Sequence, residues 1–182
     1  MATTTPTAAT LRSVTGARPS PMVWLRAGAA GGMLAGAAFA MFEMLAAVVQ
    51  NGTGAFFMPL RMIGAIALGQ GALDPASALL PAAAAGLMVH MALSMMYGVA
   101  VAALIALVPV LNRSADTILA IAGAAGFALW AVNFLVLARA LGWPWFPDTQ
   151  HVGVQIVAHV LVFGGLLGLL LDRMAFARGR QA

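Results

Sequence analysis

Four long apolar stretches constrain this chain more than any other feature of its sequence. They cover about residues 21–50, 75–108, 117–141 and 149–172. Each stretch is long enough to cross the hydrocarbon core of a bilayer as an α-helix. In lipid every backbone N–H and C=O must find a partner within the protein, and a helix achieves this without help from neighbours. The stretches therefore predict an all-α integral membrane protein, folded as a four-helix bundle in contact with the lipid bilayer.

The composition agrees with lipid as the main solvent. Hydrophobic residues make up 63% of the 182 residues and charged residues only 8%, whereas a soluble domain is about half apolar and about a quarter charged. The chain has no Cys, which excludes disulfides, thiolate metal sites and cysteine nucleophiles. All nine basic residues are Arg, and they lie at the ends of the apolar stretches rather than in one patch. We therefore expect no nucleic-acid partner.

The segments outside the four spans define the rest of the organisation. Residues 59–69 begin with Pro and end with Gly but are too few to span. We expect a short interfacial or re-entrant helix there, between the first two spans. Residues 1–20 are rich in Thr, Ala and Pro and are predicted to be a disordered tail. One bundle domain would cover residues 21–173, and residues 174–182 would form a second tail.

The distribution of arginine predicts the orientation. An even number of spans places both termini on the same side of the membrane. That side would hold seven of the nine arginines, whereas Arg61 and Arg139 would lie on the other. Because positively charged segments are retained in the cytoplasm, we expect both termini to be cytoplasmic. The expected location is the inner (plasma) membrane of a bacterium.

Each span carries one conspicuous polar residue on or beside a stripe of small residues. These residues are Glu43, His90, Asn133 and His159. Counting about 1.5 Å of rise per residue from the helix ends places all four at a similar depth, in the outer half of the membrane. Ionisable residues at such a depth usually face a bundle interior or a cavity. The four residues therefore predict a buried polar layer.

The fourth span extends this layer toward the outer surface. His151, Gln155 and His159 are spaced four residues apart, so they lie on one stripe of a helix. Gln155 and His151 would then form a polar track from the layer to the outer end of the bundle.

The polar layer has the residue types of a cofactor site. Two imidazoles and a carboxylate are common ligands for zinc, iron or manganese, so Glu43, His90 and His159 are candidate metal ligands. A pair of histidines on two helices can also hold haem b, with His90 and His159 as the axial ligands. The chain lacks the Glu-x-x-His pairs that di-iron bundles use.

Two other interpretations need no cofactor. Interhelical polar contacts specify which helices pair and in which register. On that basis our first interpretation is a structural or accessory membrane component, acting with other membrane subunits or with a second copy of itself. Alternatively, Glu43 and the histidines could pass protons in a proton-linked carrier. No residue pattern assigns an enzymatic reaction.

Overall fold

The structure is a computed structural model that describes residues 19–146 and 151–177. Within these residues, four helical segments are long and apolar enough to cross a membrane. A shorter helix stands between the first two spans, and the remaining described segments are turns and short helical pieces. The prediction of an all-α fold with four apolar spans and one short helix is therefore confirmed.

The elements follow one another along the chain in this order. The first span is α2 (Pro21–Asn51), the short helix is α3 (Met58–Leu68) and the second span is α4 (Leu79–Leu107). The third span joins α5 (Ala115–Ala131), η4 (Val132–Leu137) and α6 (Ala138–Ala140). The fourth joins α7 (Val152–Val157), η5 (Ala158–Gly165) and α8 (Leu166–Ala177). The segments η4 and η5 are π-helical. Single 3₁₀ turns, η1 (Thr53–Ala55), η2 (Gln70–Leu73) and η3 (Pro109–Asn112), complete the described connections.

Two helix ends differ from the sequence prediction by four residues or more. The second span begins at Leu79 rather than at residue 75, because residues 74–77 form a turn in which a carboxylate oxygen of Asp74 accepts the N–H of Ala76. The fourth span continues through Ala177, past its predicted end. The remainder of the two predicted tails, residues 1–18 and 178–182, lies outside the described residues.

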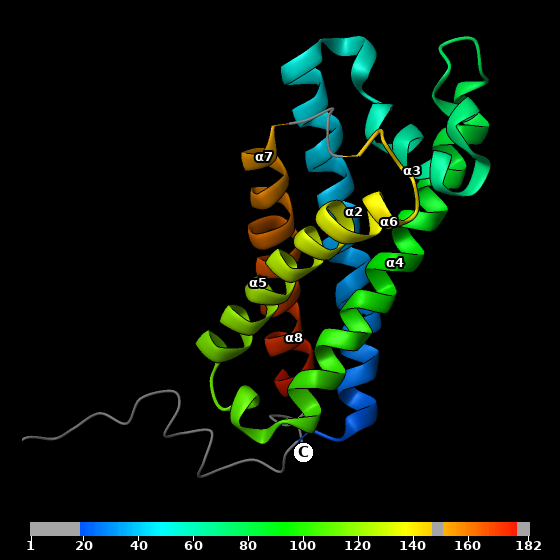
Figure 1. The fold of residues 1–182 in the computed structure, drawn as a ribbon. Helices are drawn as coiled ribbons and strands as arrows, with labels where there is room; N and C mark the ends of the chain where they lie inside the picture. The colour runs from blue at the N-terminus through cyan, green and yellow to red at the C-terminus, as the bar shows by residue number, and fades with distance from the viewer. Residues whose placement is uncertain (1–18, 147–150, 178–182) are drawn as a thin grey trace, which may run out of the picture.

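The helices pack as two pairs that α2 joins. One pair is α2 with α4, on which α3 also packs, and the other is α5 with the fourth span. The α2 helix also contacts η5 and α8, whereas α4 and α5 share few contacts. Figure 1 shows the start of α2 and the end of α8 at one end of the bundle, with α3 at the opposite end.

Glycines set these pairings by removing side chains where two backbones meet. A Cβ atom on Gly28 of α2 would lie 2.6 Å from the carbonyl oxygen of Gly98 on α4. A Cβ atom on Gly164 of η5 would lie 2.5 Å from the carbonyl oxygen of Ala122 on α5. Both distances are too short for a real side chain, so only glycine permits this spacing of the helices.

The outer surface of the spans is apolar. Large side chains such as Met41, Met88 and Leu161 are at least half exposed on it. In water such a surface would be costly, whereas a bilayer accommodates it. The four apolar helices therefore suit an integral membrane protein.

Candidate functional site

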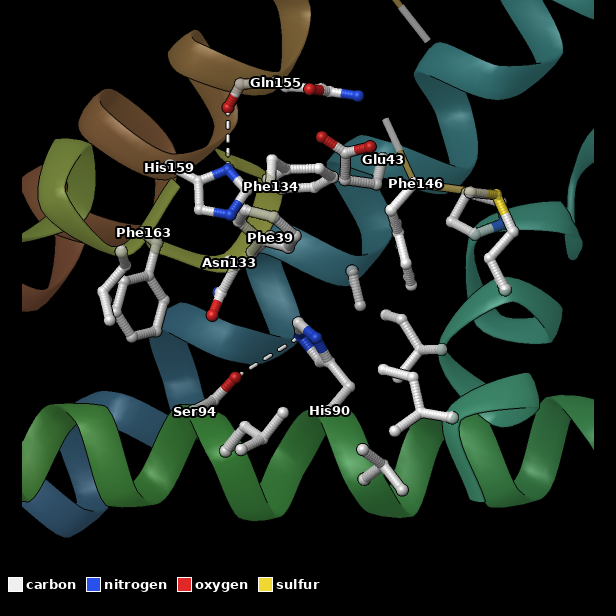
Figure 2. A pocket seen from close by; sticks show the side chains of 18 of the residues that line it. Phe39, Glu43, His90, Ser94, Asn133, Phe134, Phe146, Gln155, His159 and Phe163 are labelled. Carbon is white, nitrogen blue, oxygen red and sulfur yellow. Dashed lines mark hydrogen bonds between the residues drawn. The ribbon is translucent and has the colours of Figure 1, made fainter. Parts of the chain in front are cut away.

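A cavity of about 320 Å³ lies inside the bundle, between the two helix pairs. Residues from α2, α3, α4, the third span, the connection after it and the fourth span line it. Five residues of the predicted polar layer and track reach this cavity: Glu43, His90, Asn133, Gln155 and His159. The sixth, His151, is exposed at the start of α7 and does not line it. The structure thus brings together one polar residue or more from each span (Figure 2).

His90 is oriented by the α2–α4 contact. Its Nε2 donates to the carbonyl oxygen of Gly36 over 2.8 Å, and the hydroxyl of Ser94 lies 3.5 Å from the same nitrogen. A Cβ atom on Gly36 would clash with the side chain of Ser94. The glycine in α2 therefore lets the polar face of α4 approach, and that approach fixes the imidazole.

His159 is oriented by its own helix. Its Nδ1 donates to the carbonyl oxygen of Gln155 over 2.8 Å (Figure 2). The residue lies within the π-helical segment η5, and Asn133 lies within the other one, η4. Such segments are rare, and they are frequently found at functional sites. Both spans of the second helix pair thus depart from regular α-helix where they meet the cavity.

Phe39 lies against both imidazoles. Its ring centroid is 5.4 Å from that of His90 in a stacked arrangement and 4.7 Å from that of His159 in an edge-to-face arrangement. The two histidines therefore share an aromatic neighbour instead of facing each other directly.

The three candidate metal ligands are not gathered into one group. Within the described residues, no three His, Asp or Glu side chains gather closely enough to hold a metal ion, so Glu43, His90 and His159 do not form a three-ligand set. A haem between the histidines would need one nitrogen of each imidazole aimed at a common iron. His90 directs Nε2 at a backbone carbonyl and His159 directs Nδ1 at another, while Phe39 packs on both rings. The nitrogens left for an iron are Nδ1 of His90 and Nε2 of His159, and haem binding stays a prediction.

The polar groups extend along the cavity rather than forming one layer. His90 bonds to Gly36, and Glu43 lies seven residues farther along α2, about 10 Å at helical rise. The sequence estimate, which counts each residue's depth from the end of its helix, misses this difference because the helices do not end at the same height in the bundle. Gly36 lies 15 residues before the end of α2, whereas its partner His90 lies only 11 residues after the start of α4.

Two further hydrogen bonds connect neighbouring spans beside the cavity. The hydroxyl of Tyr97 on α4 donates to Oδ1 of Asn133 over 3.2 Å. The indole N–H of Trp130 on α5 donates to Oε1 of Gln155 over 3.2 Å. Sequence reasoning did not place Phe39, Tyr97 or Trp130 in the site. An aromatic residue with a polar tip inside an apolar span is the signal that could have found two of them.

The short helix α3 covers one side of the cavity. Five of its residues line the cavity: Pro59, Leu60, Met62, Ile63 and Ile66. The guanidinium of Arg61 donates to the carbonyl oxygen of Ala72 over 2.9 Å and to the hydroxyl of Ser77 over 2.7 Å. The indole N–H of Trp145 donates to the carbonyl oxygen of Met62 over 3.1 Å. These bonds tie α3 to the connection that leads into α4 and to the connection that follows the third span.

Comparisons with known proteins identify no relative of this chain. No protein-family model matches the sequence, and comparisons with curated proteins and with solved structures find no significant match. Functional inference therefore rests on the geometry of the cavity.

Proposed function

We propose that this chain is an integral membrane protein that binds a small, largely apolar molecule in the central cavity. The observation that carries the proposal is the convergence of polar side chains from all four spans on one cavity of about 320 Å³. Known ligand pockets are about 300–1,000 Å³ in volume, with mainly apolar walls and a few placed polar groups. The walls here are mostly aliphatic and aromatic, and a few polar groups are spaced along them.

A purely structural role accounts less well for this volume. Protein interiors are close-packed, and voids larger than a water molecule are few. A polar layer that only fixes helix register would be packed shut, because an empty volume forfeits dispersion contacts. The Tyr97–Asn133 and Trp130–Gln155 hydrogen bonds do connect neighbouring spans. They lie beside the cavity and leave it open. These bonds can therefore fix the helix register while the cavity binds a ligand.

The test compares two variants of one helix. Ala40 is buried and lines the cavity, whereas Ala37 is exposed on the outside of α2. With 4-butylphenol as the probe, we expect thermal unfolding in detergent to shift upward for the wild type and for Ala37→Phe. A concentration of about one hundred times Kd would stabilise the folded state by about 2.7 kcal/mol. Ala40→Phe fills the cavity and should lose the shift.

Two results would overturn the proposal. One is the absence of any shift in the wild type at saturating probe, and the other is an equal shift in all three proteins. If Ala40→Phe does not fold, Ile66→Trp fills the same cavity from α3 and serves as the second variant.

We also propose that both termini face the cytoplasm, in a bacterial inner membrane, on the strength of the arginine distribution. The chain has no Cys, so a thiol reagent can label only the single cysteine that is introduced. Gln70→Cys and Asn112→Cys lie in connections at opposite ends of α4. A membrane-impermeant maleimide added to intact cells should label only Gln70→Cys. Labelling of Asn112→Cys alone would invert the orientation.

A further inference from the structure

The histidines determine which hydrogen-bonding groups the cavity offers. A carbonyl oxygen can only accept, so the nitrogen of His159 that contacts the carbonyl of Gln155, Nδ1, must carry the proton. An imidazolium inside a membrane bundle is costly, which favours the neutral ring. A neutral ring that donates from Nδ1 has a lone pair on Nε2. The hydrogen bond that His159 forms with a described residue is the one through Nδ1, and no bond of this kind reaches its Nε2.

His159 therefore presents an acceptor inside the protein. Its side chain is only 9% exposed and lines the cavity, and Figure 2 shows its second nitrogen on the side away from Gln155. His90 repeats the pattern, because its Nε2 donates to Gly36 and its Nδ1 is left as the acceptor. An acceptor that faces a mainly apolar cavity without a donor is costly. The complementary ligand carries an O–H or N–H group.

The surroundings of His159 favour a flat ring as the bearer of that group. Phe39 and Phe134 both meet its imidazole edge-to-face, at ring-centroid distances of 4.7 and 5.6 Å. Phe146 and Phe163 also line the cavity close by (Figure 2). Aromatic walls of this kind pack well on another aromatic ring, in offset-stacked or edge-to-face contacts.

We infer that the cavity opens between the second and third spans, because few contacts join them. Both spans contribute a row of residues to the cavity lining: Val89, Leu93 and Tyr97 from α4, and Leu129, Asn133 and Leu137 from the third span. These two spans share few contacts. Across the described residues, the Tyr97–Asn133 bond is the one hydrogen bond that joins them. Both spans have the length and hydropathy of membrane helices, so this side faces lipid.

We propose that the cavity takes a lipid-soluble molecule with a hydroxyl-bearing aromatic head, a phenol or hydroquinone, whose O–H donates to Nε2 of His159. The molecule reaches the cavity from the lipid between α4 and η4. This inference rests on the proposed function, since it assigns the chemical class of the ligand to the same cavity.

The experiment compares three probes that differ only in the head. They are 4-butylphenol, its methyl ether 4-butylanisole, and butylbenzene. Calorimetric titration in detergent gives their affinities for the wild type, His159→Phe and His151→Phe. His151 is the matched control because it is exposed and does not line the cavity. We expect the wild type and His151→Phe to bind the phenol about tenfold more tightly than the ether. His159→Phe should bind both equally.

Each other outcome has a defined meaning. Equal affinity of the wild type for the phenol and the ether would overturn the inference and leave the proposed function standing. A phenol preference that survives in His159→Phe would overturn the role of this histidine. Binding of none of the three probes would overturn the proposed function itself. Retained binding of butylbenzene shows that the His159→Phe protein is folded, and the phenol–ether comparison in the wild type needs no variant.

Discussion

The contact between α3 and α4 predicts a substitution whose effect has an unexpected sign. Gly86 lies in the interior of α4 and is buried against α3. Replacing a helical glycine with alanine ordinarily stabilises a helix by about 1 kcal/mol. Helix propensity alone would therefore make Gly86→Ala more stable than the wild type.

The structure predicts the opposite. A Cβ atom on Gly86 would lie 2.7 Å from the carbonyl carbon of Leu60 and closer still to its oxygen, whereas ordinary contact begins at 3.4 Å. The backbone of α3 would thus have to retreat by at least 0.7 Å, the difference between those distances. Overpacking of this kind costs about 1–3 kcal/mol. After the gain in helix propensity is subtracted, we expect the free energy of unfolding to fall by up to about 2 kcal/mol.

The assay is the free energy of unfolding in mixed micelles as the fraction of SDS is raised, followed by circular dichroism. Gly153→Ala is the matched control, because Gly153 lies in α7 with nothing within 4 Å of an added Cβ atom. It should be neutral or stabilising by up to about 1 kcal/mol. A Gly86→Ala protein more stable than the wild type would refute the packing of α3 on α4.

Three further predictions follow from single contacts. Tyr97→Phe removes the hydrogen bond to Asn133 and should lower the free energy of unfolding by less than about 1 kcal/mol, the average for such bonds in membranes; a loss of several kcal/mol in the same SDS titration would contradict this. Arg61→Gln removes the guanidinium bonds that hold α3 and should speed proteolysis of the connection between α3 and α4, with an unchanged cleavage rate as the contrary result. Val89→Phe narrows the cavity on the side of α4 and should slow the association of 4-butylphenol, measured by stopped flow. Met88→Phe, on the exposed surface, should leave the association rate unchanged. Equal association rates for the two variants would contradict access from the lipid.

The sequence predicts the coarse fold well because hydropathy and length alone specify membrane spans. The short helix was predictable for a different reason, because Pro and Gly mark its ends. Five of the six polar residues reach one cavity, which follows from the high cost of exposing them to lipid. Glu43 and His90 nevertheless differ in depth, because the heights of helix ends depend on tertiary packing.

The finer features of the site had no local signal. The π-helical segments around Asn133 and His159 arise in apolar sequence with no Pro to mark them. The position of Phe39 between two imidazoles depends on how α2 rotates about its axis. Sequence periodicity shows which residues share one face of a helix. The rotation of each helix about its axis and the angle at which two helices cross depend on glycine contacts between helices that are distant in sequence. Residue types alone do not specify which side chains converge, so the metal-ligand set of Glu43, His90 and His159 stays a prediction.

Photolabelling tests the central claim, a ligand site inside the bundle, most directly. A diazirine-bearing alkylphenol is irradiated with the wild-type protein in lipid nanodiscs, and the labelled residues are located by mass spectrometry. We predict labels on cavity residues such as Met62, Tyr97 and Phe134, suppressed by an excess of 4-butylphenol. Labels spread over exposed residues such as Met41 and Leu161, and unaffected by that excess, would contradict the claim.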